Sequence, residues 1–323
     1  MIEQGEPEQQ PLVSVVIPTY DRPDYLREAL SSVVAQRYRN LEIIVQDNAS
    51  PTDIEAVVAG FGDPRIRFVR NPENIGQFAN FVTVFRRATG KYVACLSDDD
   101  IWEEEYLSTL VPRLEADPDL VVAFSDHSII DGEGRIDEAE TDANSRRWQR
   151  HALAEGAHRP FDEIALVYRS ICSASAAVFR RDAIDWHAIP KEVGLGFDLY
   201  LSYLAARTGR GAWYSRRRLV RYRVHGGSMT NAVKALNRRV QGATDAIFYW
   251  NEFLNDPRVA RHRAYFRMKL TYNTLVLVSC LLRQGRIATA ARQAGALFGL
   301  RLLTPTLLVH HLMYAARLRR PAA

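Results

Sequence analysis

The sequence predicts an α/β fold of Rossmann-like type, with a mostly parallel sheet flanked by helices and a helical appendage at the C-terminal end. Two observations lead to this fold class. Strand-like and helix-like runs alternate through the first hundred residues, a pattern that produces a parallel sheet covered on both faces. The last third of the chain loses this alternation and shows helical patterns only.

Short apolar runs predict the first four strands, and the first of them is rich in β-branched residues, as buried parallel strands are. Apolar residues at helical spacing predict the helices between them. The predicted strands are Leu12–Ile17, Leu41–Val45, Ile66–Val69 and Lys91–Leu96, and the predicted helices are Pro23–Gln36, Asp53–Phe61 and residues 74–88.

The pattern becomes less regular after Asp100. A polar stretch, residues 132–160, has few apolar residues and is predicted to be a mobile loop. Beyond residue 231 four helical segments are expected. The remaining predicted elements are helices at Glu104–Ala116, Phe161–Ser170 and Leu199–Ala206, and strands at Leu120–Ser125, Ala174–Phe179 and Arg218–Val224.

Charge is distributed unevenly along the 323 residues. From Arg210 onward there are 21 Lys and Arg against three acids, a charge of +18, whereas residues 1–209 hold 21 basic and 35 acidic residues, a charge of −14. This asymmetry predicts different partners for the two ends. We expect a catalytic domain at residues 1–229 and a basic helical region at residues 230–323.

The three cysteines lie far apart in sequence, without the paired spacing of a disulfide framework or a thiolate zinc site. The opening residues are acidic and polar, which predicts a short disordered segment rather than a secretory signal. Both features indicate a cytoplasmic protein.

Polar side chains follow the predicted strands at the edge where ligands bind in such sheets. The strongest of these signals is Asp98-Asp99-Asp100, directly after the fourth strand. Three adjacent carboxylates raise one another's pKa, and a divalent cation such as Mg²⁺ or Mn²⁺ removes that conflict. The alternative is a solvated acidic turn at the start of a helix.

The second predicted strand ends at Asp47, whose carboxylate can accept hydrogen bonds from a ligand N–H or hydroxyl. An Asx-turn with Asn48 would explain the same residue without a ligand.

Four motifs in this order resemble the family 2 inverting glycosyltransferases of GT-A fold: Val13–Tyr20, Leu41–Ser50, Asn74-Ile75-Gly76 and Leu96–Asp100. The resemblance covers about the first 230 residues. It implies transfer of a sugar from a UDP- or dTDP-type nucleotide sugar, with Asp100 binding Mn²⁺ or Mg²⁺ and Asp47 binding the base. Asp98 is expected toward the ribose. The implied nucleotide-binding residues are Pro18, Thr19, Tyr20, Asp47, Asn74, Asp98 and Asp99.

Inverting transfer needs a base for the acceptor hydroxyl. Asp198 lies after Gly194-Leu195-Gly196-Phe197 and resembles the family's catalytic base, although many relatives carry a Glu-Asp pair where this chain has Phe197 before the acid. The alternative is an ordinary aspartate at a helix N-terminus. Arg221–Ser228 resembles the closing Tyr-Arg-x-His stretch of such domains, which implies that His225 completes the metal shell or contacts the diphosphate. A structural histidine is the alternative.

The C-terminal region mixes arginines with three apolar stretches, Leu275–Leu282, Ala294–Leu303 and Leu307–Ala316. None reaches the ~20 apolar residues that span a bilayer. Amphipathic helices of this kind bind anionic membrane surfaces, which would place the protein on the cytoplasmic face of the inner membrane with a glycan or lipid-linked glycan as acceptor. The alternative is a soluble helical lid. Nucleic acid is not an expected partner, since no recognised binding module accompanies the charge.

Two other functions compete with sugar transfer. A sugar-phosphate nucleotidyltransferase would need a Gly-rich basic loop after the first strand, and Pro18–Pro23 is not one. A non-catalytic membrane-associated scaffold would not need the acids that this chain retains. The Gln-x-x-Arg-Trp signature of processive synthases is absent from the sequence, so we expect the transfer of one sugar at a time. The expected setting is cell-surface polysaccharide or glycolipid biosynthesis.

Overall fold

The computed structural model describes residues 10–226 and 236–299. The chain divides into two compact units. The first holds the residues up to Lys191 together with Leu201–His225. The second holds Glu192–Tyr200 and the described residues from Gly226 onward.

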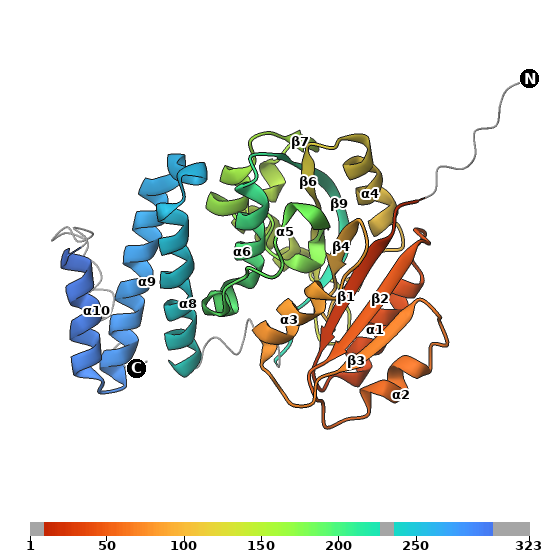
Figure 1. Cartoon of the computed structure of the whole chain (residues 1–323), viewed down its shortest axis with the longest axis horizontal. Coiled ribbons are helices and arrows are strands. Elements are labelled where there is room, and N and C mark those ends of the chain that lie inside the picture. The colour runs from red at the N-terminus through yellow and green to blue at the C-terminus, as the bar shows by residue number, and fades with distance from the viewer. Residues whose placement is uncertain (1–9, 227–235, 300–323) are drawn as a thin grey trace, which may run out of the picture. The chain divides into compact units, whose positions relative to one another are not determined.

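The first unit is built on a nine-stranded mixed sheet in the order β3-β2-β1-β4-β8-β6-β9-β5, with β7 paired to β9 (Figure 1). β1, β2, β3 and β4 run parallel to one another, and β6 runs parallel to β9, while β8, β5 and β7 are antiparallel to their neighbours. The strands are β1 Val13–Thr19, β2 Leu41–Asp47, β3 Ile66–Arg70, β4 Tyr92–Cys95, β5 Ile101–Trp102, β6 Leu120–Ile130, β7 Gly156–His158, β8 Ala177–Arg180 and β9 Gly211–Arg223.

The helices of the first unit follow the predicted alternation with the strands. Asp53 caps α2 by accepting a hydrogen bond from the backbone N–H of Ala56 at 3.0 Å. The α-helices are α1 Pro23–Val34, α2 Ile54–Ala59, α3 Gln77–Arg86, α4 Tyr106–Ala116 and α5 Glu138–Arg147, and the shorter helical turns are η1 Arg150–Ala152, η2 Glu163–Val167, η3 Ala174–Ala176 and η4 Arg181–Ala183. Two further elements, η5 Lys191–Gly196 and α6 Phe197–Ala206, are divided between the two units.

The core of the first unit lies between the sheet and its helices. Every residue of β1 is buried, and α1 buries Leu26, Ala29, Leu30 and Val33, which recur at the spacing of one helix face. Burial of this stripe against β1 and β2 holds the first βαβ segment together. The fold class that the sequence predicts is confirmed.

The prediction of a mobile loop at residues 132–160 is wrong. This segment contains α5, η1 and β7, and Asp137 caps α5 by accepting from the N–H of Glu140. Its buried side chains are Thr141, Ser145 and Arg150, so the segment is ordered by polar contacts rather than apolar ones. A search for apolar periodicity does not detect such order.

The second unit is a group of helices with an aromatic core. Trp250 stacks on Phe266 with ring centroids 5.8 Å apart, and Phe253 meets both rings. The predicted fourth helical segment, which includes Leu307–Ala316, lies outside the described residues. The helices are α8 Leu236–Asn255, η6 Pro257–His262, α9 Arg263–Arg283 and α10 Ile287–Gly299 (Figure 1).

The apolar stretch Leu275–Leu282 is largely buried inside this unit. Leu275, Leu277 and Leu281 are buried, while Leu282 stays exposed. Among the described helices, none combines the length and the apolarity needed to cross a bilayer.

Candidate active site

The acidic cluster Asp98-Asp99-Asp100 follows β4 and lies against the end of β1. Thr19 Oγ1 donates to Asp98 Oδ2 at 2.8 Å, and the backbone N–H of Tyr20 donates to the same oxygen at 3.2 Å. Pro18 and Thr19 are the last two residues of β1, and Tyr20, which follows the strand, is about half exposed. The structure therefore brings Thr19 and Tyr20 together with Asp98, as expected for residues at the ends of adjacent parallel strands.

Arg22 joins two of the aspartates. Its Nη1 donates to Asp98 Oδ1 at 3.1 Å and to Asp99 Oδ2 at 2.8 Å. Burial and the neighbouring charge of Asp99 raise the pKa of Asp98 to about 6, although Arg22 and the hydrogen bond from Thr19 act in the opposite direction. The cluster therefore holds more negative charge than one arginine offsets.

Asp100 is the most enclosed of the three aspartates. Its Oδ1 accepts a hydrogen bond from the backbone N–H of Arg223 at 2.9 Å. Its Oδ2 is buried and has no hydrogen-bonding partner within the described residues. Burial and the charge of Asp99 raise the pKa of Asp100 well above its usual value.

The fully buried guanidinium of Arg223 supports the loop that carries these acids. Its Nε donates to the backbone carbonyl of Asp99 at 2.8 Å, and its Nη2 donates to Glu28 Oε2 at 2.5 Å. Nη1 donates to the carbonyl of Gly132 at 2.9 Å, and the guanidinium lies 4.6 Å from the centre of the Tyr25 ring. One side chain thus connects β9, α1, the acidic cluster and the turn after β6.

His225 lies beside the same cluster. Its Nε2 is 3.1 Å from Asp99 Oδ2, and its ring packs against Tyr25 with the centroids 4.9 Å apart. The histidine therefore contacts Asp99 rather than Asp100, the aspartate assigned to the metal.

Asp47, the last residue of β2, is completely buried. Its Oδ1 accepts from the backbone N–H of Ser50 at 3.1 Å, which closes a turn over Ala49 at a positive φ of 61°. Arg70 Nη1 lies 3.1 Å from Asp47 Oδ2. The turn runs to Ser50 rather than to Asn48, and it leaves the carboxylate beside a half-exposed arginine.

Asn74 belongs to a network of amides at the ends of β2 and β3. Asn48 Nδ2 donates to Asn74 Oδ1 at 2.9 Å, and Asn71 Nδ2 donates to Asn48 Oδ1 at 3.0 Å. Asn74 Oδ1 also accepts from the N–H of Gly76, whose φ of 83° suits glycine. The network fixes the loop that begins α3.

Asp198 occupies the first turn of α6 and is grouped with the second unit. The preceding segment approaches α8 closely, because the N–H of Leu195 donates to Asp245 Oδ2 at 2.9 Å. A Cβ on Gly194 would lie 2.2 Å from that oxygen, and a Cβ on Gly196 would lie 2.3 Å from the Tyr249 ring. The two glycines before Asp198 are explained by this close approach.

Comparison with known proteins identifies the family. The model of glycosyl transferase family 2 matches residues 14–185, more than half of the chain. The chain belongs to glycosyl transferase family 2. An uncharacterized protein of Mycobacterium tuberculosis is 28% identical to it over 243 residues, which are 68% of this chain and 66% of that relative. The chain thus spans just under two thirds of that relative's length.

Solved structures show that this family 2 chain has the GT-A fold. The mannosyltransferase PcManGT from Pyrobaculum calidifontis, solved in complex with GDP-Man and Mn²⁺, matches with a TM-score of 0.58 at 20% identity, over 96% of this chain and 87% of that one. Staphylococcus aureus TarS residues 1–349, in complex with UDP-GlcNAc, matches with a TM-score of 0.59 at 16% identity, over 83% and 71%.

The acidic cluster is the part of this family 2 chain at which the divalent cation is expected. Among the described residues, no group of three or more His, Cys, Asp or Glu side chains is placed so that it could hold a metal ion by itself. Mg²⁺ commonly takes only one or two carboxylates and completes its shell with phosphate oxygens and water. The buried Oδ2 of Asp100, without a partner among the described residues, is an oxygen of the kind that Mg²⁺ takes.

Sequence reasoning missed two arginines of this family 2 site, Arg22 and Arg223. Arg22 lies three residues beyond β1, just after the residues expected to bind the nucleotide. Arg223 lies inside the Arg221–Ser228 motif, in which only His225 is expected at the site. The signal that points to them is indirect: three adjacent carboxylates at one strand end need basic partners.

Proposed function

We propose that this protein transfers a single sugar, with inversion, from a UDP- or dTDP-type nucleotide sugar to an acceptor hydroxyl, and that the transfer depends on Mn²⁺ or Mg²⁺. The observation that carries the proposal is the acidic cluster at the end of β4. Within the described residues the buried Oδ2 of Asp100 has no partner, and Asp98 accepts hydrogen bonds from Thr19 and Tyr20. Family membership and the GT-A fold support the same reaction class.

In this proposal the residues at the sheet edge bind the donor. Asp47 receives the base, Asn74 and Pro18–Tyr20 line the nucleotide pocket, and Asp98 and Asp99 bind toward the ribose and diphosphate. Asp100 holds the cation, which offsets the charge that develops on the departing diphosphate. In this proposal His225, whose Nε2 is 3.1 Å from Asp99 Oδ2, orients Asp99 and completes the metal shell or contacts the diphosphate.

Asp198 is proposed as the base that removes the proton from the acceptor hydroxyl as the anomeric carbon is attacked. Asp198 lies in the first turn of α6. An ionised carboxylate can accept that proton in the transition state.

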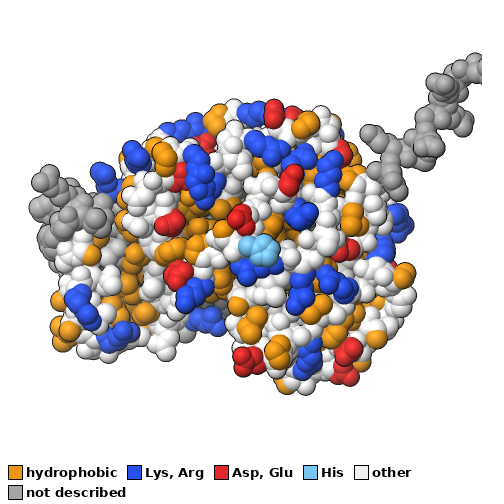
Figure 2. All heavy atoms as spheres, viewed as in Figure 1, with side chains coloured by type: hydrophobic (Ala, Val, Ile, Leu, Met, Phe, Trp, Pro, Cys, Tyr) orange, Lys and Arg blue, Asp and Glu red, His pale blue; other side chains and the backbone are white. Residues whose placement is uncertain are grey.

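For the C-terminal unit we propose contact with an anionic membrane surface and a glycan or lipid-linked glycan as acceptor, in cell-surface polysaccharide or glycolipid synthesis. Met268 and Tyr272 of α9 are about half exposed one helical turn apart, and Ile287 of α10 is 68% exposed. Figure 2 shows Lys and Arg side chains over this unit with hydrophobic side chains among them. Binding of the full chain to anionic liposomes at low salt tests this part, and failure to bind would leave a soluble helical lid.

The experiment that tests the reaction is release of nucleoside diphosphate from a panel of nucleotide sugars, with Mn²⁺, with Mg²⁺ and with chelator. We expect metal-dependent turnover of one donor, lost in Asp100→Ala and retained in Asp182→Ala, an exposed aspartate of η4. Absence of turnover together with absence of metal-dependent nucleotide binding would favour the scaffold. Formation of a nucleotide sugar from a sugar phosphate would favour a nucleotidyltransferase.

A further inference from the structure

A polar cavity of about 550 Å³ opens on the first unit where β6, α5, η1 and β9 come together. None of its lining residues is among those proposed to bind the donor. Asp126 of β6 lies four residues before Ile130, which pairs with Arg223 next to the acidic cluster. At about 3.3 Å per residue the two places lie roughly 13 Å apart along the strand, so the cavity is separate from the acidic cluster.

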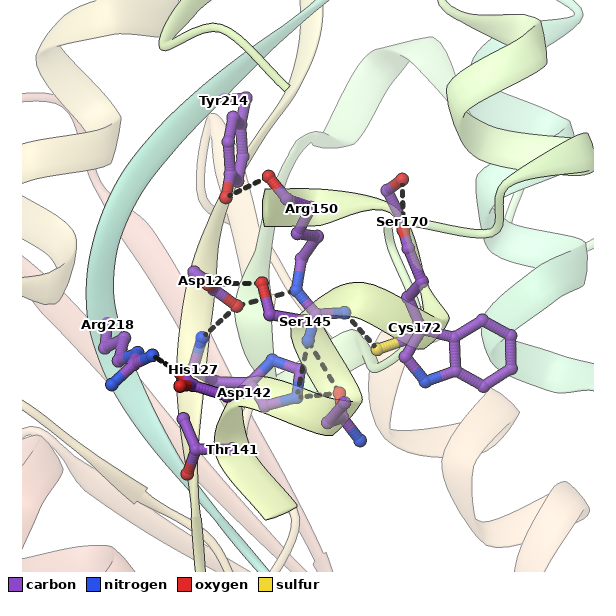
Figure 3. Close-up of polar contacts among 12 residues, drawn as sticks. Asp126, His127, Thr141, Asp142, Ser145, Arg150, Ser170, Cys172, Tyr214 and Arg218 are labelled. Atoms are coloured by element: carbon purple, nitrogen blue, oxygen red, sulfur yellow. Dashed lines mark hydrogen bonds and ion pairs between the residues drawn. The ribbon is translucent and has the colours of Figure 1, made fainter. Parts of the chain in front are cut away.

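The floor of the cavity is a buried ion pair (Figure 3). Arg150, fully buried, donates from Nε to Asp126 Oδ1 at 2.7 Å, and Ser145 Oγ donates to Asp126 Oδ2 at 3.0 Å. Tyr214 donates its hydroxyl to the carbonyl of Arg150 at 3.3 Å. Burial alone would raise the pKa of Asp126, but the charge and hydrogen bond of Arg150 outweigh it and hold that pKa below its usual value. The floor is therefore ionised, paired and rigid.

Arginines of β9 line the rim of the cavity, at the place where the pairing of β6 and β9 is irregular. The register of β6 and β9 shifts between Ser125 and Asp126, where Ser125 faces Ser215 and Asp126 faces Arg218. Two extra residues of β9, Arg216 and Arg217, are accommodated there, as in a β-bulge. Arg216 and Arg218 line the cavity, whereas Arg217 donates to Glu105 and Thr109 of α4.

Two of the rim arginines have no acidic partner in the part of the chain that the structure describes. Arg218 pairs with Glu138 at 3.1 Å and with Asp142 at 2.6 Å. Arg146 of α5 and Arg216 are exposed, and within the described residues neither side chain forms an ion pair. The four arginines and two aspartates of the lining leave a charge of +2 inside a concave surface.

We propose that this cavity is a second binding site, for a phosphate group. Guanidinium groups from α5 and β9 converge on it, and arginine forks match the oxygens of phosphate. A phosphate monoester carries a charge of about −1.5 to −2 at neutral pH, which balances the excess of the lining. The buried Asp126–Arg150 pair holds α5 and η1 in place, and Arg146 and Arg216 supply the free donors. The phosphate is either free or part of a longer molecule.

The test is calorimetric titration of the full-length protein with inorganic phosphate at low ionic strength, with chelator present. We compare wild type with Arg146→Ala/Arg216→Ala and with the matched control Arg147→Ala/Arg217→Ala. The control removes the same charge from the next residue on each element, and those arginines pair with Glu140 and Glu105 instead of lining the cavity. All four substituted arginines are exposed, so we expect both double variants to fold.

We expect phosphate to bind wild type, with affinity at least tenfold lower in the cavity variant and within about twofold of wild type in the control. No binding to wild type, or equal losses in both variants, would overturn the proposal. Dimethyl phosphate, a phosphodiester, distinguishes the two sources of the phosphate group. If dimethyl phosphate binds, the natural ligand is a phosphodiester within a longer molecule. If only inorganic phosphate binds, the natural ligand is a free or terminal phosphate. Acetate that binds as tightly as phosphate would also overturn the site's assignment. The titration involves no sugar transfer, so its failure leaves the proposed reaction unaffected.

Discussion

The side chain of Arg223 donates its Nε–H to the backbone carbonyl of Asp99 at 2.8 Å, although 124 residues separate the two. Because the acceptor is a backbone carbonyl, this hydrogen bond holds the acidic loop in place and does not occupy a carboxylate oxygen. Arg223 is fully buried and forms an ion pair with Glu28. Removal of Glu28 would therefore leave the Arg223 guanidinium charged, unpaired and out of contact with water.

We predict that Arg223→Ala lowers the free energy of unfolding by about 2 to 5 kcal/mol, because it leaves the backbone carbonyls of Asp99 and Gly132 without this donor and opens a cavity where a large side chain was buried. Arg221→Ala is the matched control. Arg221 sits two residues earlier on β9 and pairs with Glu103 near the surface, so its loss should cost less than about 1 kcal/mol. Urea-induced unfolding of both variants checks this, and equal losses would refute the structural role assigned to Arg223.

We predict that His127 contributes stability at neutral pH that is lost in acid. Burial and the charge of Arg150 lower the pKa of His127 from its usual 6.5 to about 3. Between these values the unfolded state binds a proton that the folded state does not, so the contribution is complete above pH 6.5 and decreases as the pH falls, by up to about 1.4 kcal/mol per pH unit.

Replacement of His127 by Gln should therefore remove this contribution and lower the slope of the unfolding free energy against pH, between about pH 4.5 and 6.5, by up to about 1.4 kcal/mol per pH unit. Asp98 and Asp100, whose pKa values are raised, contribute a slope of the opposite sign in both proteins, so the difference between His127→Gln and wild type is the quantity compared. His151→Gln, at an exposed histidine, should leave the slope of wild type unchanged. An unaltered slope in His127→Gln would contradict the burial of a neutral histidine at this position.

We predict that Asp47→Asn weakens nucleotide binding by about ten- to a hundredfold, the range expected for loss of a hydrogen bond to a charged group. The substitution also removes the ion pair with Arg70. Asp53→Asn is the control, since asparagine retains the helix cap of α2. Calorimetric titration with the nucleotide of the preferred donor measures both. Unchanged affinity in Asp47→Asn would assign Asp47 to the turn with Ser50 alone.

We predict that Asp198→Asn lowers kcat by about 10²- to 10⁴-fold while the dissociation constant of the nucleotide stays the same, as for loss of a general base. Asp182→Asn should keep the kcat of wild type. Single-turnover kinetics with the preferred donor, combined with nucleotide titration, separate the two quantities. A parallel loss of nucleotide affinity would instead assign Asp198 to the donor site or to the integrity of its segment.

Much of the fold could be predicted because its signals are local. The apolar runs that become β1 to β4 lie within about two residues of their predicted bounds, and the acidic cluster lies at the strand end where parallel sheets collect polar groups. Residues 132–160 could not be predicted in this way, since Asp126, Ser145 and Arg150 stabilise the segment through polar contacts that have no periodicity.

The sequence by itself determined the α/β class, the family resemblance and the place of Asp98, Asp99 and Asp100, because short-range patterns of apolar and acidic residues encode all three. Only the tertiary structure showed that Arg22, 76 residues before Asp98, joins the acids and that Arg223 supports their loop. It alone revealed the arginine-lined cavity beside α5. These relationships arise from packing between distant segments, and no spacing along the chain records which side chains that packing brings into contact.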